Sequence, residues 1–367
     1  MKVRSLVAST LSAAVLSACS ESTAPESTPA NQAPYSDSLP EARVPVSGVV
    51  FDPEALFYSF MTWPVPPDDP EGPPPPALLY GVPTVMRAAV WGARIDMVDP
   101  GGQVVDSSGP ALPPWGNFQT RGLAADPSRV YSMRAEPTPE LSVGAGDFFP
   151  EEEGFAPIPA VPYHATTTLR PVAPTGAQCL IQAPVMVGEA GALGALAQTL
   201  SVETGTATTV SGLVDPSSGR SVVLIWMYAP SPVLDTFMFP SGDIAAETTV
   251  GTLYAIEWAP PSGAPGESQM GFTAIRGGVS SIGYYALVVP PGTSGEVAVN
   301  FVDTLTDPEE GRPWIVPPFN AAGLLPGLSF ARLHAVAPEE DPPPNPYEEE
   351  YPAPDFSFLC YPPFPEE

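Results

Sequence analysis

The stretch Val222–Tyr228 (VVLIWMY) is the strongest fold signal, because seven consecutive apolar residues supply the hydrophobic surface that a folded core needs. Further runs with β-branched and aromatic residues lie on both sides of it. They are Ala89–Val98 (AVWGARIDMV), Thr248–Trp258 (TTVGTLYAIEW), Glu296–Val302 (EVAVNFV) and Leu328–Val336 (LSFARLHAV). Most of them alternate apolar and polar residues between turn residues, which predicts strands.

Proline and glycine content argues against long helices. The 367 residues include 53 prolines and 32 glycines, while 44% of residues are hydrophobic and the mean hydropathy is +0.07. Proline removes an amide donor and clashes with the preceding helical turn, so a proline at every seventh position on average interrupts helices. We therefore predict an all-β protein.

The charge balance excludes one class of partner. The chain has 13 basic and 41 acidic residues, a formal net charge of −28. Nucleic acid is an unfavourable partner for such a chain, because binding would bring phosphates against carboxylates. Most carboxylates have no basic partner and are expected to face water or divalent cations. Their mutual repulsion predicts a monomer.

The N-terminus carries the most specific motif. Two basic residues in Met1–Arg4 precede the apolar run Leu6–Leu16, which has half the length of a membrane-spanning helix and is typical of a secretory signal. The next residues, Leu16-Ser17-Ala18-Cys19, resemble the lipobox of bacterial lipoproteins. That resemblance implies a signal peptide at 1–18, lipidation of Cys19 and a membrane anchor. Because Ser20 follows Cys19, it also favours the outer membrane. The alternative is a secreted protein with a free Cys19.

Two segments rich in proline flank the predicted core. Residues 19–44 have few large apolar side chains and are expected to form a flexible tether. Residues 338–367 form an acidic, proline-rich tail. Within this tail, the aromatic cluster around Cys360 predicts that Asp355–Phe364 docks as an added edge strand.

Lipidation of Cys19 leaves two cysteines, Cys179 and Cys360. Each lies in an extended segment, beside Ile181 in one case and beside Phe358 in the other, with side chains that alternate toward one face. We expect both faces to point inward. Because disulfides persist in exported proteins, we predict a bond between them; the alternative is two buried free thiols.

Internal similarity predicts two tandem β-sandwich units, at residues 45–187 and 195–337. The first contains the proline-rich insertion Pro64–Pro76. In the first matched pair, Val46–Pro53 corresponds to Val210–Pro216, and each is expected to form a Ser-Gly strand before an Asp-Pro turn. In the second pair, Gly116–Gly122 corresponds to Gly271–Gly277. A strand that contains tyrosine follows in each unit, at Val130–Ala135 and at Gly283–Val289. These glycine and aromatic positions resemble the carboxypeptidase-regulatory-like domain, a transthyretin-like β-sandwich common in bacterial surface proteins, which implies no catalysis.

Catalytic motifs are sparse. The two histidines, His164 and His334, lie in expected strands, and the sequence has no Gly-x-Ser-x-Gly motif. No lysine follows Cys19, and no short-range set of His and Cys residues could hold zinc. The seven Asp-Pro pairs, including Asp52-Pro53, are expected to form turns. A hydrolase with two carboxylates stays open, although no pair stands out. We therefore predict no enzymatic activity.

Two kinds of ligand remain. Calcium prefers oxygen ligands, and four acidic clusters are candidates for weak binding, although the sequence has no Asp-x-Asp-x-Asp-Gly loop and solvated charge runs are the favoured explanation. The clusters are Asp68-Asp69, Glu151–Glu153, Glu309-Glu310 and Glu348–Glu350. Trp63, Trp115 and Trp314 lie among prolines, glycines and turns, so they are candidates for a ligand platform; packing on proline is the alternative. The sequence thus predicts a lipid-anchored envelope protein with a structural role or weak recognition of a glycan or surface protein.

Overall fold

Strand β14 (Ser221–Tyr228) lies at the centre of a nine-stranded sheet, and all eight of its residues are buried. It pairs in parallel with β22 (Gly327–His334) on one side and antiparallel with β19 (Tyr284–Val289) on the other. Because both of its faces are covered, the strand is a continuous apolar run. The all-β prediction is confirmed: strands dominate a computed structural model with three short α-helices among its described residues.

The structure describes residues 43–62, 87–126, 128–144, 156–174, 179–228, 244–304, 313–336 and 360. The helices are α2 (Pro53–Met61), α4 (Ala192–Thr204), α5 (Val210–Leu213) and the 3-10 helix η3 (Pro216–Ser218). The first strands are β1 (Arg43–Val44), β2 (Val46–Val49), β3 (Val90–Trp91), β4 (Arg94–Val98), β5 (Val104–Pro110), β6 (Asn117–Gln119), β7 (Leu123–Ala124), β8 (Tyr131–Glu136), β9 (Ser142–Val143), β10 (Tyr163–His164) and β11 (Thr166–Val172). The later strands are β12 (Leu180–Gln182), β13 (Val187–Gly188), β14, β15 (Ile244–Thr248), β16 (Thr252–Trp258), β17 (Phe272–Arg276), β18 (Val279–Ser280), β19, β20 (Val297–Asp303), β21 (Phe319–Ala321) and β22.

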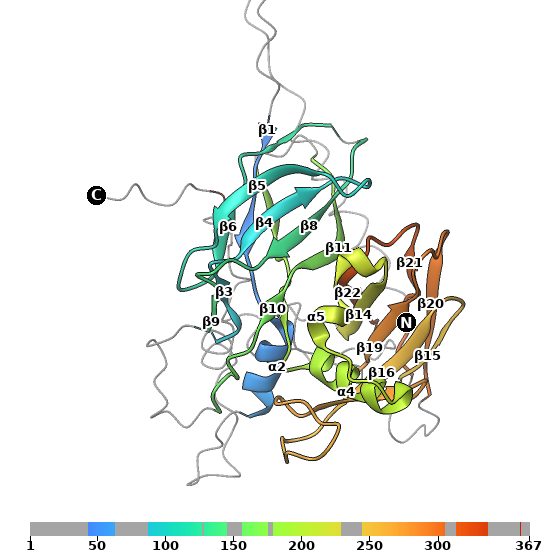
Figure 1. The fold of residues 1–367 in the computed structure, drawn as a ribbon. Coiled ribbons are helices and arrows are strands. Elements are labelled where there is room, and N and C mark those ends of the chain that lie inside the picture. Colours follow the sequence, from blue (N-terminus) through green and yellow to red (C-terminus); the bar gives the residue numbers. More distant parts are fainter. Residues whose placement is uncertain are drawn as a thin grey trace, which may run out of the picture. The chain divides into compact units, whose positions relative to one another are not determined.

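The nine-stranded sheet joins both halves of residues 42–367. Its order is β17-β16-β19-β14-β22-β11-β8-β4-β5. In Figure 1 the early strands and the late strands meet where β11 lies beside β22, and these two strands run parallel in the register Thr166↔Leu328. The two predicted units therefore share one sheet, while their boundaries stay a prediction.

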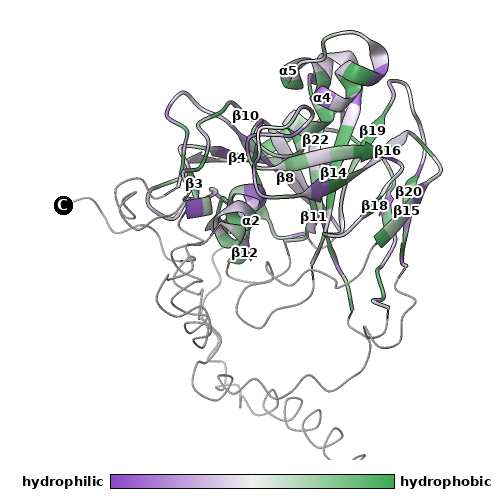
Figure 2. Ribbon diagram, turned by 90° about the horizontal axis from the view of Figure 1, so that it is seen from below, coloured by the Kyte–Doolittle hydropathy of each residue, from purple (hydrophilic) through white to green (hydrophobic). Residues whose placement is uncertain are grey.

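Alternate residues of β14 belong to two different hydrophobic cores. Val223, Ile225 and Met227 pack with residues of the four-stranded sheet β18-β15-β20-β21. Val222, Leu224 and Trp226 belong to the core that contains residues of α2, α4 and α5. Figure 2 shows hydrophobic residues along the strands around β14 and β16. The central sheet is thus covered by a second sheet on one face and by helices on the other.

The first half has a smaller core of its own. Ile95 and Met97 of β4 and Met133 of β8 pack with Val46 and Phe118 of the three-stranded sheet β12-β2-β6. Sheet edges are partly protected by other elements. Thr199 of α4, for example, donates a hydrogen bond to the carbonyl of Ala274 in edge strand β17, over 2.9 Å, which satisfies one backbone acceptor on an otherwise open edge.

The structure corrects one strand prediction. Val210–Leu213 is the helix α5 and not a strand, because the Thr209 side chain accepts a hydrogen bond from the Gly212 amide and caps a helical turn. Its proposed counterpart Val46–Val49 is strand β2. The predicted strands at Glu296–Val302 and Leu328–Val336 and both tyrosine strands are confirmed. Ala89–Val98 instead forms two strands in different sheets, β3 and β4, and Thr248–Trp258 contains the end of β15, a bend at 249–251 and then β16. In the part of the chain that the structure describes, no helix is both long and apolar enough to span a membrane.

Candidate functional site

Several predicted sites fall outside the described residues. Cys19 and Trp63 do, as do all four acidic clusters and the tail segment Asp355–Phe364 apart from Cys360. Within the described ranges no group of three or more His, Cys, Asp or Glu side chains is arranged to hold a metal ion. Weak calcium binding therefore stays a prediction.

A disulfide joins Cys179 and Cys360, whose Cα atoms lie 5.8 Å apart. The carbonyl of Cys360 also accepts a hydrogen bond from Gln119 Nε2 in β6, over 3.4 Å. The expected inward orientation of the Cys179 strand is wrong for Ile181, which is 42% exposed. The reason is that β12 is an edge strand of a small sheet. The bond thus ties Cys360 to the edge of that sheet.

The two described tryptophans of the predicted platform stand beside different sheets. Trp115 is 37% exposed and lies in the turn before β6. Trp314 is half-buried before β21, and its backbone amide donates a hydrogen bond to Asp303 Oδ2 over 2.8 Å. No ring contact between the two is found in the described part of the chain. A shared aromatic platform therefore gains no geometric support from this pair.

A buried acidic pair, Asp52 and Glu54, opens helix α2. Asp52 is the N-cap: its Oδ1 accepts hydrogen bonds from the amides of Glu54 (2.8 Å) and Ala55 (3.1 Å). Its Oδ2 accepts a hydrogen bond from the Tyr163 hydroxyl of β10 over 2.6 Å. Asp52-Pro53 was expected to form a turn between strands. It starts a helix instead, because proline suits the first helical position and aspartate caps it.

Glu54 caps a second helix that is distant in sequence. Its Oε1 accepts hydrogen bonds from the amide of Ala192, the first residue of α4, over 3.0 Å and from the Tyr284 hydroxyl over 2.6 Å. The N-cap of α4 is Gly191, which offers no side-chain hydrogen bond. A Cβ at Gly191 would lie only 1.7 Å from Glu54 Oε2. The carboxyl group of Glu54 therefore occupies the space and the role of a missing N-cap side chain.

Burial controls the ionisation of this pair. Each residue is 1% exposed. Loss of hydration raises the pKa of Asp52 to about 6, although its hydrogen bonds partly oppose the shift. Burial, together with the charge of Asp52, raises the pKa of Glu54 to about 8. The pKa of the Tyr284 hydroxyl also rises, again mainly through burial. The raised pKa values favour retention of a proton by this pair at a pH where exposed carboxyl groups are ionised.

This charge state resembles that of a general acid beside a carboxylate, as in glycoside hydrolysis. Such chemistry needs both groups to touch a substrate. Asp52 and Glu54 are instead enclosed by α2, β10, α4 and β19, and their oxygens accept hydrogen bonds from groups of these elements. The arrangement can anchor two helices to the central sheet. The sequence signal that could have located it is Asp-Pro-Glu before an apolar run, a helix-start pattern.

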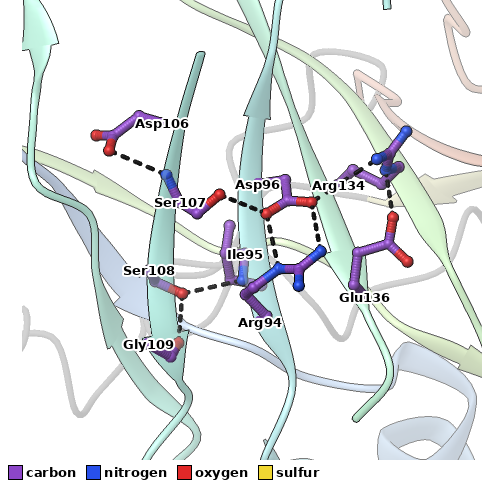
Figure 3. Close-up of polar contacts among 9 residues, drawn as sticks. All are labelled: Arg94, Ile95, Asp96, Asp106, Ser107, Ser108, Gly109, Arg134 and Glu136. Carbon is purple, nitrogen blue, oxygen red and sulfur yellow. Dashed lines mark hydrogen bonds and ion pairs between the residues drawn. The ribbon is translucent and has the colours of Figure 1, made fainter. Parts of the chain in front are cut away.

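Another buried carboxylate, Asp96, lies at the centre of a polar network on β4, β5 and β8 (Figure 3). Arg94 donates hydrogen bonds to Asp96 from Nε (2.9 Å) and Nη2 (3.0 Å). Ser107 Oγ donates to Asp96 over 2.7 Å, and Arg134 Nη2 lies 3.7 Å away. Arg134 Nε also lies 2.6 Å from Glu136 Oε1. Asp96 is 1% exposed, while the Arg94 side chain is 49% exposed, so the network compensates the buried charge from the solvent side.

The two histidines lie at or near the surface, at the ends of β10 and β22. His164 Nε2 lies 2.8 Å from Glu189 Oε1, and both side chains are partly exposed. His334 is the exposed last residue of β22. Neither arrangement is a Ser-His-Asp site, since the described contacts of His164 include no serine hydroxyl.

Comparison with known proteins gives no family. No protein-family model matches the chain, and no curated protein matches it in sequence. Two solved structures align over most of it. The Bacillus anthracis TIE protein is 7% identical, with a TM-score of 0.17, over 80% of this chain and 34% of that one, so this chain spans about a third of its length. A candidate adhesin from Bacteroides ovatus is 7% identical, with a TM-score of 0.18, over 82% and 89% of the two chains. Similarity at this level supports no assignment of family or function.

Proposed function

We propose that the chain is an exported lipoprotein of the bacterial envelope that acts without catalysis, as a structural component or a weak recognition module. The disulfide between Cys179 and Cys360 carries the export part of this proposal, because such bonds persist in oxidising compartments. The lipobox-like residues Leu16–Cys19 supply the anchor. The tether expected at 19–44 ends before residue 43, because Arg43–Val44 is strand β1 and pairs with β7. Processing at Cys19 would remove Lys2 and Arg4 and leave 11 arginines and 41 acidic residues, a formal charge of −30.

The non-catalytic part is supported by how the buried acids are used. Asp52 and Glu54 bind helix amides and tyrosine hydroxyls inside the fold, and Asp96 binds Arg94 and Ser107. Asp52 and Glu54 are carboxyl groups whose pKa burial raises, as it does in many general acids. Because each is engaged by neighbouring elements, a hydrolase of the two-carboxylate type would need a second pair at the surface.

Export and anchoring are tested by expressing the full-length chain in a bacterium that processes lipoproteins. The expected product fractionates with the outer membrane, and its N-terminal peptide begins at a Cys19 that carries the diacylglyceryl mass. The variant Cys19→Ala is expected in the soluble fraction. Recovery of the unmodified thiol at Cys19, or of all protein from the cytosol, would refute the anchor. Thiol counting of Cys19→Ala in denaturant tests the disulfide separately: two free thiols before reduction would exclude it.

Recognition of a glycan or surface protein through exposed aromatic residues is the second candidate. Trp115 favours it, because 37% of this residue is exposed in a turn. Leu112 in the same turn is 46% exposed and offers a matched control. On a polysaccharide array, Trp115→Ala should lose binding that Leu112→Ala retains. Equal profiles for both variants and the parent would exclude Trp115 as a contact residue.

A further inference from the structure

The acidic pair at the start of α2 connects parts of the chain that are far apart in sequence. Glu54 reaches Ala192 of α4, 138 positions away, and Tyr284 of β19, 230 positions away. Asp52 reaches Tyr163 of β10, 111 positions away. The start of α4 thus depends on one carboxyl group of α2 for its cap.

The hydrogen-bond donors to the two carboxyl groups are amides and hydroxyls, which carry no charge. Two adjacent buried carboxylates without a cation at hydrogen-bond distance repel each other in a medium of low polarity. Retaining one proton removes this repulsion, as it does in carboxylate dyads. The proton is therefore part of the contact between α2 and α4.

Among the described residues, no arginine is a cause of the shifted pKa of Asp52 or of Glu54. Tyr228 of β14 is fully buried, and its hydroxyl has no hydrogen-bond partner among the described residues. Arg332 of β22 lowers the pKa of Tyr228, but burial outweighs this effect. The first turn of α4 holds no acidic residue. Just before it, Glu189 is paired with His164 at the surface.

We propose that Asp52 and Glu54 form a proton-operated latch, which holds α4 against α2 while the pair retains a proton and loosens this junction when the proton leaves at alkaline pH. When the junction opens, both carboxyl groups become exposed to water, and the retained proton passes to solvent. Between about pH 6 and pH 8 one proton is released on opening, because the pKa of Glu54 is about 8 when buried and near 4.5 when exposed. The opening constant should then rise about tenfold for each pH unit.

Hydrogen exchange of the backbone amides Ala192–Leu196 tests the latch in the purified full-length protein, after correction for the intrinsic pH dependence of exchange. We expect protection of these amides to fall about tenfold per pH unit between pH 6 and pH 8. In Glu54→Gln the neutral amide oxygen can still accept both hydrogen bonds, so protection should not change with pH. Asp96→Asn removes a different buried carboxylate and should keep the parental dependence.

Protection that is independent of pH in the parent, or an equal slope in Glu54→Gln, would overturn the latch. If Glu54→Gln does not fold, carbon-13 labelling of the glutamate side-chain carboxyl groups decides the matter in the parent protein. One glutamate should titrate above pH 7 and cause chemical-shift changes in the amides at the start of α4. Titration of every glutamate near pH 4.5 would equally refute the proposal.

Discussion

Gly191 offers the sharpest test of the Glu54 cap. At this position a methyl group would lie 1.7 Å from Glu54 Oε2 and 2.4 Å from Glu54 Cδ. Gly191 has φ −105° and ψ −136°, so Gly191→Ala does not create a left-handed residue, and the double variant with Glu54→Ala, described below, isolates the cost of the collision. The glycine at the other end of α4, Gly205, is the matched control. It has φ +66°, and a Cβ there would have no neighbour within 4 Å.

The two substitutions should differ in magnitude. Displacing Glu54 leaves the Ala192 amide and the Tyr284 hydroxyl buried without an acceptor. Each unsatisfied donor costs about 1–3 kcal/mol, so Gly191→Ala should lower the free energy of unfolding by about 4 kcal/mol. Gly205→Ala introduces only a left-handed alanine, which costs about 1 kcal/mol.

Urea denaturation at pH 6, followed by circular dichroism and by the fluorescence of buried Trp226, measures both free energies. The reasoning is refuted if Gly191→Ala is no more destabilising than Gly205→Ala. The double variant Gly191→Ala with Glu54→Ala adds a control. Because the collision disappears with the carboxyl group, the double variant should be about as stable as Glu54→Ala alone.

Three other predictions concern stability. Because the Cys179–Cys360 disulfide spans 181 positions, the chain-entropy relation predicts that replacing both cysteines by serine costs up to about 5 kcal/mol; no change in the urea midpoint would contradict this. The pKa of Glu54 is raised on folding, so its contribution to the free energy of unfolding is complete below about pH 4 and is lost as pH rises to about 8. The loss should total about 3–5 kcal/mol. Urea titrations at a series of pH values should show this decrease, and Glu54→Gln should abolish most of it. Arg94→Ala should destabilise more than Asp96→Asn, because it strips hydrogen bonds from a buried carboxylate, whereas Arg94 is half exposed and remains solvated without its partner; thermal melting that ranks the two variants in reverse order would contradict the role of this network.

Local sequence patterns predicted the strands because each pattern reports the burial of its own segment. The strand Val222–Tyr228 lies in the centre of the large sheet, and Glu296–Val302 alternates as expected for a strand covered on one face. The same approach failed where one short motif serves two structures. Val46–Val49 and Val210–Leu213 share a Ser-Gly pair, yet Thr209 caps the second segment as a helix.

The long-range contacts of the buried acidic pair were beyond prediction for a related reason. Asp52-Pro53 fits a turn as well as a helix start, and nothing near Glu54 in sequence indicates that it caps α4. Contacts across 138 and 230 positions depend on how the sheet brings the segments together. An exposed and a buried carboxylate look identical in a chain that has 41 acidic residues.

The sequence by itself determined the all-β class and the strongly acidic balance, and its proline content argued against long helices, because composition and alternation act locally on each segment. It also supplied the lipobox-like motif, whose chemistry is confined to four consecutive residues. Only the tertiary structure decided that both halves share one nine-stranded sheet, and that Asp52 and Glu54 are shielded from water. The reason is that both the pairing of strands and the loss of hydration depend on segments that are distant in sequence and meet in space. The loss of hydration in turn raises the pKa values of Asp52 and Glu54.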